Sequence, residues 1–304
     1  MRNTYHNIDF KHYTRWKIGG VIKELFVPDS KITLINKINE LIDNNQNYTV
    51  VGQTSNLLIF DGYIDATIIK IGTNFSKHCF ENEDVICDPG VDVPVLNWKL
   101  SQKGYSGIEH TCGIPGTIGG LVCMNGGSNR KSISENIKWV EVITKNGVIK
   151  KFNKLQCDFS YRNSIFQSGE YTILRVCLTN FTNCKKSDIR HKCLETYYQR
   201  KNKFPQKKPN CGSFFKRNLD VINTLGAPGR IIENLGFKGY KVGGAEVSTK
   251  HANFINNNQN ASASDIINIG NEINNKVYDE YGFKFESEAK YLDEKGNIRV
   301  VING

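Results

Sequence analysis

The sequence predicts an α+β protein, because stretches with helical spacing are mixed with short strands and tight turns. Apolar residues recur at helical spacing in 32–42 and again in 266–281. Asn146-Gly147 lies between two apolar runs, which is the strongest short signal for a β-hairpin. The 304 residues correspond to roughly two domains of about 150 residues each.

In the first half of the chain, the first helix is expected to start at Pro28-Asp29-Ser30. Its apolar positions are Ile32, Ile35, Ile38 and Ile42. The elements expected after it are a strand over 48–51, a polar turn over 52–56, an apolar run over 57–60 and a helix over 93–103 that is closed by Gly104.

In the second half of the chain, the predicted elements are two hairpins and two helices. They are a hairpin of 139–144 with 148–152, a helix over 187–203 ended by Pro205, a helix from an N-cap at Ser264 to Gly282, and a hairpin of 283–292 with 298–302. Glu286 and Glu288 alternate along a predicted strand, so both carboxylates are expected on one face. The basic stretch 184–210, punctuated by proline, is the preferred domain boundary.

The charge of the chain favours anionic partners. Its net charge is +10, and much of the surplus lies between Lys185 and Arg217. This segment fits a solvated helix face with a basic loop, a rim that attracts polyanionic small ligands, or a nucleic-acid surface. No nucleic-acid motif accompanies it, and we expect no nucleic-acid partner.

The cysteines do not form a disulfide or metal pattern. All nine stand singly with no CxxC pair, and we expect reduced thiols packed as small core residues and no bound metal. No stretch approaches the length of a membrane-spanning helix, and the N-terminus lacks the apolar middle of a secretory signal. We therefore expect a cytoplasmic protein with no membrane insertion.

Three clusters could carry chemistry. The glycine-rich segments 52–56 and 113–127 could cradle a diphosphate with backbone N–H groups, although a pair of tight turns would leave the same pattern. Arg162 follows a tyrosine and is by default a surface cation. Ser213 stands between a glycine and two aromatic residues, which suits either a functional hydroxyl or a turn.

Together these segments resemble the UDP-N-acetylenolpyruvoylglucosamine reductases of bacterial cell-wall synthesis. Each motif is weak alone, but their shared order along nearly the whole chain is specific. The motifs are Tyr13–Gly20, Val27–Ser30, Gly52–Leu58, Gly107–Glu109, Gly113–Gly120, Met124-Asn125, Tyr161–Ser164, Gly212–Lys216, Ile231–Glu233, Gly243–Ala245, His251–Ile255 and Phe285–Glu288. The compact middle region is similar to the shorter variety of the family, which lacks a tyrosine loop that clamps the substrate.

The resemblance implies an FAD-binding fold of the vanillyl-alcohol-oxidase type. Two flavin subdomains would occupy 1–75 and 76–186, and an α+β substrate domain with C-terminal strands would occupy 187–304. The implied reaction is the FAD-dependent reduction of UDP-N-acetylglucosamine enolpyruvate to UDP-N-acetylmuramate with NADPH, in the synthesis of peptidoglycan precursors. The implied partners are therefore a UDP-sugar substrate and NADPH.

The resemblance also implies roles for single residues. Arg162 would meet the charge that develops on the substrate, Ser213 would donate the proton, and Glu288 would help to hold the carboxylate end. The implied cofactor-binding residues are Gly52, Ser55, Asn56, Gly113, Ile114, Pro115, Gly116, Gly119, Gly120 and Asn125. The implied substrate-binding residues are Lys216, Arg217, His251 and Asn253.

Three parts of the sequence depart from the family pattern. Gln53 and Thr54 stand where further glycines are usual, Arg130 and Lys131 add bulk to the run 129–131, and Arg217 stands where an asparagine is usual. Two other functions therefore stay open: a diverged FAD-dependent relative that acts on another nucleotide sugar, and a non-catalytic nucleotide-binding protein.

Overall fold

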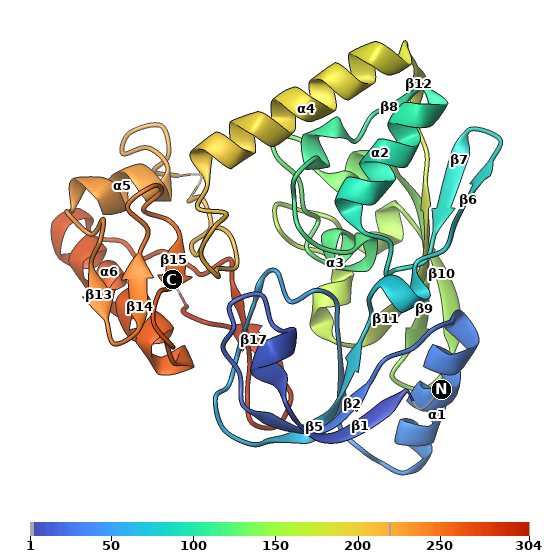
Figure 1. Cartoon of the computed structure of the whole chain (residues 1–304), viewed down its shortest axis with the longest axis horizontal. Coiled ribbons are helices and arrows are strands. Elements are labelled where there is room, and N and C mark those ends of the chain that lie inside the picture. Colours follow the sequence, from blue (N-terminus) through green and yellow to red (C-terminus); the bar gives the residue numbers. More distant parts are fainter. Residues whose placement is uncertain (1–2, 219, 304) are drawn as a thin grey trace. The chain divides into compact units, whose positions relative to one another are not determined.

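The computed structural model describes residues 3–218 and 220–303, and its chain folds into two compact units (Figure 1). Unit 1 comprises 1–5, 25–53 and 67–200, and unit 2 comprises 6–24, 54–66 and 201–304. The cut between Arg200 and Lys201 falls inside the predicted boundary stretch 184–210. The three-way division at 75 and 186 stays a prediction, because compactness groups the chain in two.

Unit 1 is built around a five-stranded antiparallel sheet of order β10-β9-β11-β7-β6. The hairpin at Asn146-Gly147 is confirmed, with β9 and β10 paired from Ile143–Ile149 to Trp139–Asn153. In Figure 1, β9, β10 and β11 lie side by side. The strands are β6 (His78–Glu81), β7 (Asp84–Cys87), β9 (Ile137–Thr144), β10 (Ile149–Asn153) and β11 (Tyr171–Leu178).

Two helices of unit 1 bury their apolar residues with this sheet. The helix α2 (Val93–Lys103) has the predicted bounds, since Asp92 caps its first turn and Gly104 ends it in the left-handed region at φ 87°. The short helix α3 (Ile118–Cys123) follows the glycine-rich segment. Apolar residues of α2, α3, β7, β9 and β11 share one core.

A second core of unit 1 lies beneath α1 (Lys31–Asp43). Ser30 and Thr33 form a capping box, so the helix starts where the sequence predicts. Ile38 is buried and Ile35 and Ile42 pack against this core as predicted, whereas Ile32 is 70% exposed. The buried face of α1 is completed by Leu34 and Leu41. The parallel pair of β3 (Tyr48–Val51) and β5 (Ile64–Lys70) belongs to a sheet of order β1-β2-β5-β3. The cut between the units falls within β1 (Thr4–Asp9), β2 (Val21–Phe26) and β5.

Unit 2 packs the long helix α6 (Ala263–Tyr281) onto a core that includes Trp16, Phe214 and Phe285. Gly282 ends α6 as predicted, but the N-cap is Ser262 and not Ser264. Ser262 forms a capping box with Asp265, three residues on, so Ser264 lies inside the first turn. Two three-stranded sheets complete the unit, β13-β14-β15 and β17-β16-β4.

The predicted strand 283–292 is wrong in its first part. Only β16 (Lys290–Leu292) pairs with β17 (Ile298–Val300), and β16 also pairs in parallel with β4 (Leu57–Ile59). Glu286 and Glu288 precede the strand, so they do not alternate along one. The remaining elements are β8 (Tyr105–Ser106), β12 (Thr182–Asn183), α4 (Lys186–Lys203), α5 (Pro228–Asn234), β13 (Lys241–Val242), β14 (Ala245–Val247) and β15 (Ile255–Asn257).

All nine cysteines are free thiols. Cys87, Cys112, Cys157, Cys177 and Cys211 are buried, whereas Cys79 and Cys184 are exposed, so core packing describes only part of the set. None of the described helices is long and apolar enough to cross a membrane.

Candidate active site

In unit 1, the structure brings Gly52 and Gln53, the start of the first glycine-rich segment, beside the second segment. A Cβ on Gly52 would lie 2.8 Å from Oγ1 of Thr117, the residue that caps α3. Gln53, which replaces a usual glycine, donates a hydrogen bond of 3.2 Å to Asp92, and Asp92 forms an isolated bridge with Thr117. The side chain of Gln53 thus links the first segment, through Asp92, to the second.

The backbone of the second segment offers hydrogen-bond donors. Gly113 and Gly116 have φ values of 76° and 144°, a conformation that favours glycine. Among the described residues, no protein group accepts a hydrogen bond from the N–H of either glycine. The N–H of Ile114 donates to the carbonyl of Thr111, and this bond fixes the turn of residues 111–114, which contains Gly113. Two unpartnered amides on a fixed turn suit an anion such as a diphosphate.

The other predicted cofactor residues of unit 1 make contacts within the protein. Gly119 lies against Pro89, where a Cβ would approach to 2.8 Å, and Gly120 is exposed, with its N–H bonded to Thr117. Pro115 is half-buried between Ile114 and Gly116. 

Asn125 joins three segments of unit 1. Its Nδ2 donates 2.7 Å to the carbonyl of Ser160, and its Oδ1 accepts from the N–H of Ser134. Ser160 starts the turn that carries Arg162, because it forms an isolated bridge with Asn163. Asn125 therefore connects the glycine-rich segment to the turn that carries Arg162.

Arg162 is held in a constrained position. Its φ is 53°, its Nη2 donates 3.0 Å to the carbonyl of Gly127, and its guanidinium lies 5.2 Å from the ring centre of Tyr161. A non-glycine residue in the left-handed region costs about 1–2 kcal/mol. The tight Ser160–Asn163 turn and the bond to Gly127 hold Arg162 in this conformation.

Arg200 of α4 is a functional candidate that the sequence analysis missed. Burial and the nearby charge of Arg162 lower the pKa of Arg200 to about 10. The side chain of Arg200 also lies against Gly113, since a Cβ there would be 3.4 Å from its Cδ. The sequence signal was only its place among the basic residues of 185–217. Two guanidinium groups that repel each other beside a glycine turn suit an anionic ligand.

In unit 2, backbone hydrogen bonds join the segment that carries Ser213 to the segment that carries Glu288. The N–H of Glu288 donates 2.7 Å to the carbonyl of Phe214, and Phe215 bridges to Ser287. Ser213 and Glu288 are both half-buried. Gly212, at φ 82°, has open space where a Cβ would stand, so Ser213 follows an uncrowded turn. The structure thus pairs the segments that carry two of the three predicted catalytic residues.

Asn253 fixes the segment that carries Ser213. Its Oδ1 accepts from the N–H of Phe215 at 2.9 Å, and its Nδ2 donates to the carbonyl of Phe215 at 2.9 Å. Its own carbonyl accepts from Phe214. The amide of Asn253 is thereby bonded to backbone, which makes it a support of the serine segment.

The remaining predicted residues of unit 2 differ in their surroundings. Burial lowers the pKa of His251 to about 4, and its ring packs against the stacked rings of Phe204 and Phe254, so His251 is neutral near pH 7. Lys216 forms an ion pair of 2.6 Å with Glu286, and Arg217 is exposed.

The turn 54–56 contributes to the same part of unit 2. Asn56 donates 2.9 Å to the carbonyl of Glu288, and Ser55 beside it is half-buried. Thr54, at φ 54°, accepts from the N–H of Arg15, so its hydroxyl stabilises this turn. Asn56 thus fixes the backbone of Glu288, a role that the sequence did not suggest.

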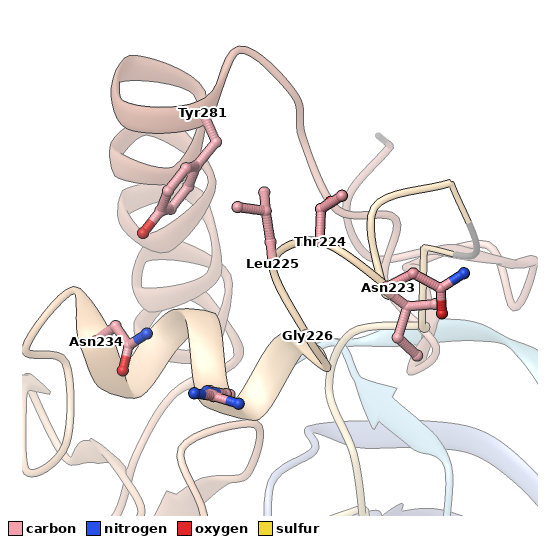
Figure 2. Close-up of a pocket in the computed structure, with 8 residues that line it drawn as sticks. Asn223, Thr224, Leu225, Gly226, Asn234 and Tyr281 are labelled. Atoms are coloured by element: carbon pink, nitrogen blue, oxygen red, sulfur yellow. The ribbon is translucent and has the colours of Figure 1, made fainter.

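A cavity of about 310 Å³ lies elsewhere in unit 2 (Figure 2). Arg230 and Asn234 of α5, Tyr281 of α6 and the loop 222–226 line it. Figure 2 shows Tyr281 and Leu225 facing the same space. None of the predicted site residues lines this cavity.

Comparison with known proteins accounts for both parts of the chain. Residues 23–153 match the model of an FAD binding domain, and residues 204–292 match the C-terminal domain of UDP-N-acetylenolpyruvoylglucosamine reductase. The protein is therefore an FAD-binding oxidoreductase with a second α+β domain. The predicted fold class is confirmed.

Individual relatives agree with both family models. A UDP-N-acetylenolpyruvoylglucosamine reductase of Corynebacterium glutamicum is 37% identical over 96% of this chain and 87% of its own length. The reductase of Bacillus subtilis is 31% identical over 94% of this chain and 93% of its own length. The crystal structure of the Thermus caldophilus reductase superposes with a TM-score of 0.79 at 27% identity, covering 93% of this chain and 97% of that one. The chain belongs to the UDP-N-acetylenolpyruvoylglucosamine reductase family.

Proposed function

We propose that this protein reduces UDP-N-acetylglucosamine enolpyruvate to UDP-N-acetylmuramate with NADPH as reductant, as a cytoplasmic step in peptidoglycan precursor synthesis. The observation that carries the proposal is the 37% identity to the Corynebacterium glutamicum reductase over 96% of the chain. Arg162, Ser213 and Glu288 lie in segments through which the sequence resembles the family.

The residues of unit 1 fit FAD. The amides of Gly113 and Gly116 and the close approach of Gly52 to Thr117 suit the diphosphate. When bound, FAD would supply hydride transfer between NADPH and the enolpyruvyl group.

The proposed roles of the catalytic residues follow from the charge of the substrate. Hydride addition to an enolpyruvyl ether leaves negative charge on the carbon next to the carboxylate. Arg162 would stabilise that charge, and Glu288 would hold the carboxylate end. Ser213 would then give its proton to the carbanionic carbon, which is basic enough to accept it.

A direct assay tests the proposed function. The purified protein should carry the yellow colour of flavin, and its oxidation of NADPH should depend on UDP-N-acetylglucosamine enolpyruvate. A yellow protein that oxidises NADPH only with another nucleotide sugar would favour the diverged relative. A colourless protein that cannot be reconstituted with FAD would favour the non-catalytic binding protein.

Arg200→Gln should weaken ligand binding, because Arg200 lies beside Arg162 and Gly113. Loss of one charged hydrogen bond costs about 1.5–3 kcal/mol, or roughly 10- to 100-fold in affinity. We expect the KM for NADPH or for the nucleotide sugar to rise by about that factor. Arg190→Gln is the matched control, since Arg190 lies on the same helix over Trp98. Equal effects of the two variants would contradict the role.

Asn253→Ala should lower turnover without removing flavin. Its amide makes two hydrogen bonds to Phe215, and their loss would loosen the segment that carries Ser213. We expect kcat to fall about 10-fold or more while flavin content and the rate of flavin reduction by NADPH stay unchanged. Asn253→Asp, which keeps the acceptor for the N–H of Phe215, should restore part of the rate. A fall in flavin reduction alone would contradict this positioning role.

A further inference from the structure

The middle of α4, from Lys192 to Tyr197, packs against the segment that leads into the glycine turn of unit 1. Lys192 lies 3.6 Å from Glu109, and Tyr197 lies 3.4 Å from where a Cβ of Gly113 would stand. Cys193 stands between these two contacts on α4, and Cys112 stands between them on the facing segment. The contacts on both sides keep the two cysteines opposite each other.

Packed in this way, the side chains of Cys112 and Cys193 act on each other's pKa. Cys112 is 6% exposed and Cys193 is half-buried, so Cys193 is the more accessible of the two. The side chain of Cys112 lowers the pKa of Cys193, whereas the side chain of Cys193 together with burial raises the pKa of Cys112. A thiol with a lowered pKa is more often ionised, and the thiolate is the form that attacks a disulfide.

We propose that Cys112 and Cys193 are a dithiol site that forms a reversible disulfide, which ties α4 to the glycine turn at Gly113. The site is distinct from the proposed catalytic residues. Cys87 and Cys177 also influence each other, but both are buried, and burial raises the pKa of Cys177 to about 11 and that of Cys87 higher still.

The proposed oxidant is a low-molecular-weight disulfide such as oxidised glutathione. The thiolate of Cys193 attacks one sulfur of that disulfide, a mixed disulfide forms, and one glutathione thiolate leaves. Cys112 then loses its proton, and its thiolate attacks the sulfur of Cys193. The Cys112–Cys193 bond forms and the second glutathione leaves, so two protein thiols are oxidised and one disulfide is reduced to two thiols.

The consequence for the glycine turn rests on the proposed function. Cys112 directly precedes Gly113, whose amide we place in the flavin site. A covalent link to α4 would restrict opening of this turn, so FAD should dissociate more slowly from the oxidised protein. Reduction with dithiothreitol should restore the original dissociation rate.

Thiol mapping tests the proposal independently of catalysis. The full-length protein, as purified with any bound flavin, is equilibrated with glutathione of stepped redox ratio, quenched by alkylation, digested and analysed by mass spectrometry. We expect one cross-linked peptide that joins Cys112 to Cys193, with the loss of two alkylation sites and full reversal by dithiothreitol. The map is read in the same way whether or not the protein reduces the enolpyruvyl substrate.

Variants distinguish this pair from general oxidation. Cys193→Ser should abolish the cross-link and leave Cys112 unmodified, whereas Cys184→Ser, at an exposed cysteine close to the start of α4, should leave the cross-link unchanged. The proposal is overturned if Cys193 carries only glutathione, if Cys112 or Cys193 is found bonded to another cysteine, or if both stay reduced until the protein unfolds.

Discussion

Ser213→Ala is expected to lower product formation by about 10²- to 10⁴-fold, the range for loss of a positioned proton donor. Reduction of the flavin by NADPH should keep its rate, because that half-reaction needs no proton from Ser213. The bound substrate should also keep its affinity, since the hydroxyl acts only when the carbanionic carbon forms. Rapid mixing with NADPH alone, followed by mixing of the reduced protein with substrate, separates the two half-reactions.

The matched control is Ser264→Ala, at an exposed serine in the first turn of α6. It should leave both half-reactions unchanged. If Ser213→Ala slows flavin reduction as much as product formation, Ser213 supports the fold of the segment and is not the donor. If neither half-reaction slows, another group donates the proton.

Short-range chemistry explains the part of the fold that the sequence predicts well. The bounds of α2 follow from Asp92 and Gly104, and the β9–β10 hairpin follows from Asn146-Gly147. These signals act between residues only a few positions apart. The error at α6 is of the same kind, because the capping box of Ser262 with Asp265 was readable in the sequence.

The strand predicted through Glu286 and Glu288 failed for a different reason. Phe285 packs into the core of unit 2, and Ser287 bonds to the backbone of Val301 and Ile302, so tertiary contacts shape this segment before β16 begins. An alternating sequence pattern cannot report such contacts.

The site residues depend on contacts that are distant in sequence. Asn253 bonds to a residue 38 positions away, and Asn125 bonds to one 35 positions away. No local sequence pattern indicates either of these supporting roles. The resemblance to a family identifies the two positions, but it does not say which groups their side-chain amides bind. Arg200 was hidden for the same reason, because its approach to Arg162 and Gly113 depends on the packing of α4.

Arg162→Asn is expected to lower kcat by about 10²- to 10³-fold, the cost of removing a group that stabilises charge in the transition state. The fall in kcat should exceed any rise in KM for the nucleotide sugar, because the negative charge that Arg162 meets develops during the reaction. Steady-state kinetics with varied substrate give both values.

The backbone at residue 162 allows this loss to be separated from a loss of stability. Arg162 has φ 53°, and asparagine adopts this region more readily than arginine, which offsets the lost hydrogen bond to Gly127. We expect the unfolding temperature of Arg162→Asn to stay close to that of the wild type while kcat falls. Arg162→Lys keeps a positive charge but not the planar guanidinium, and it should recover only part of the rate. A variant with unchanged kcat would show that the cation does not act on the substrate, and a fall that tracks lost stability would assign Arg162 to the turn alone.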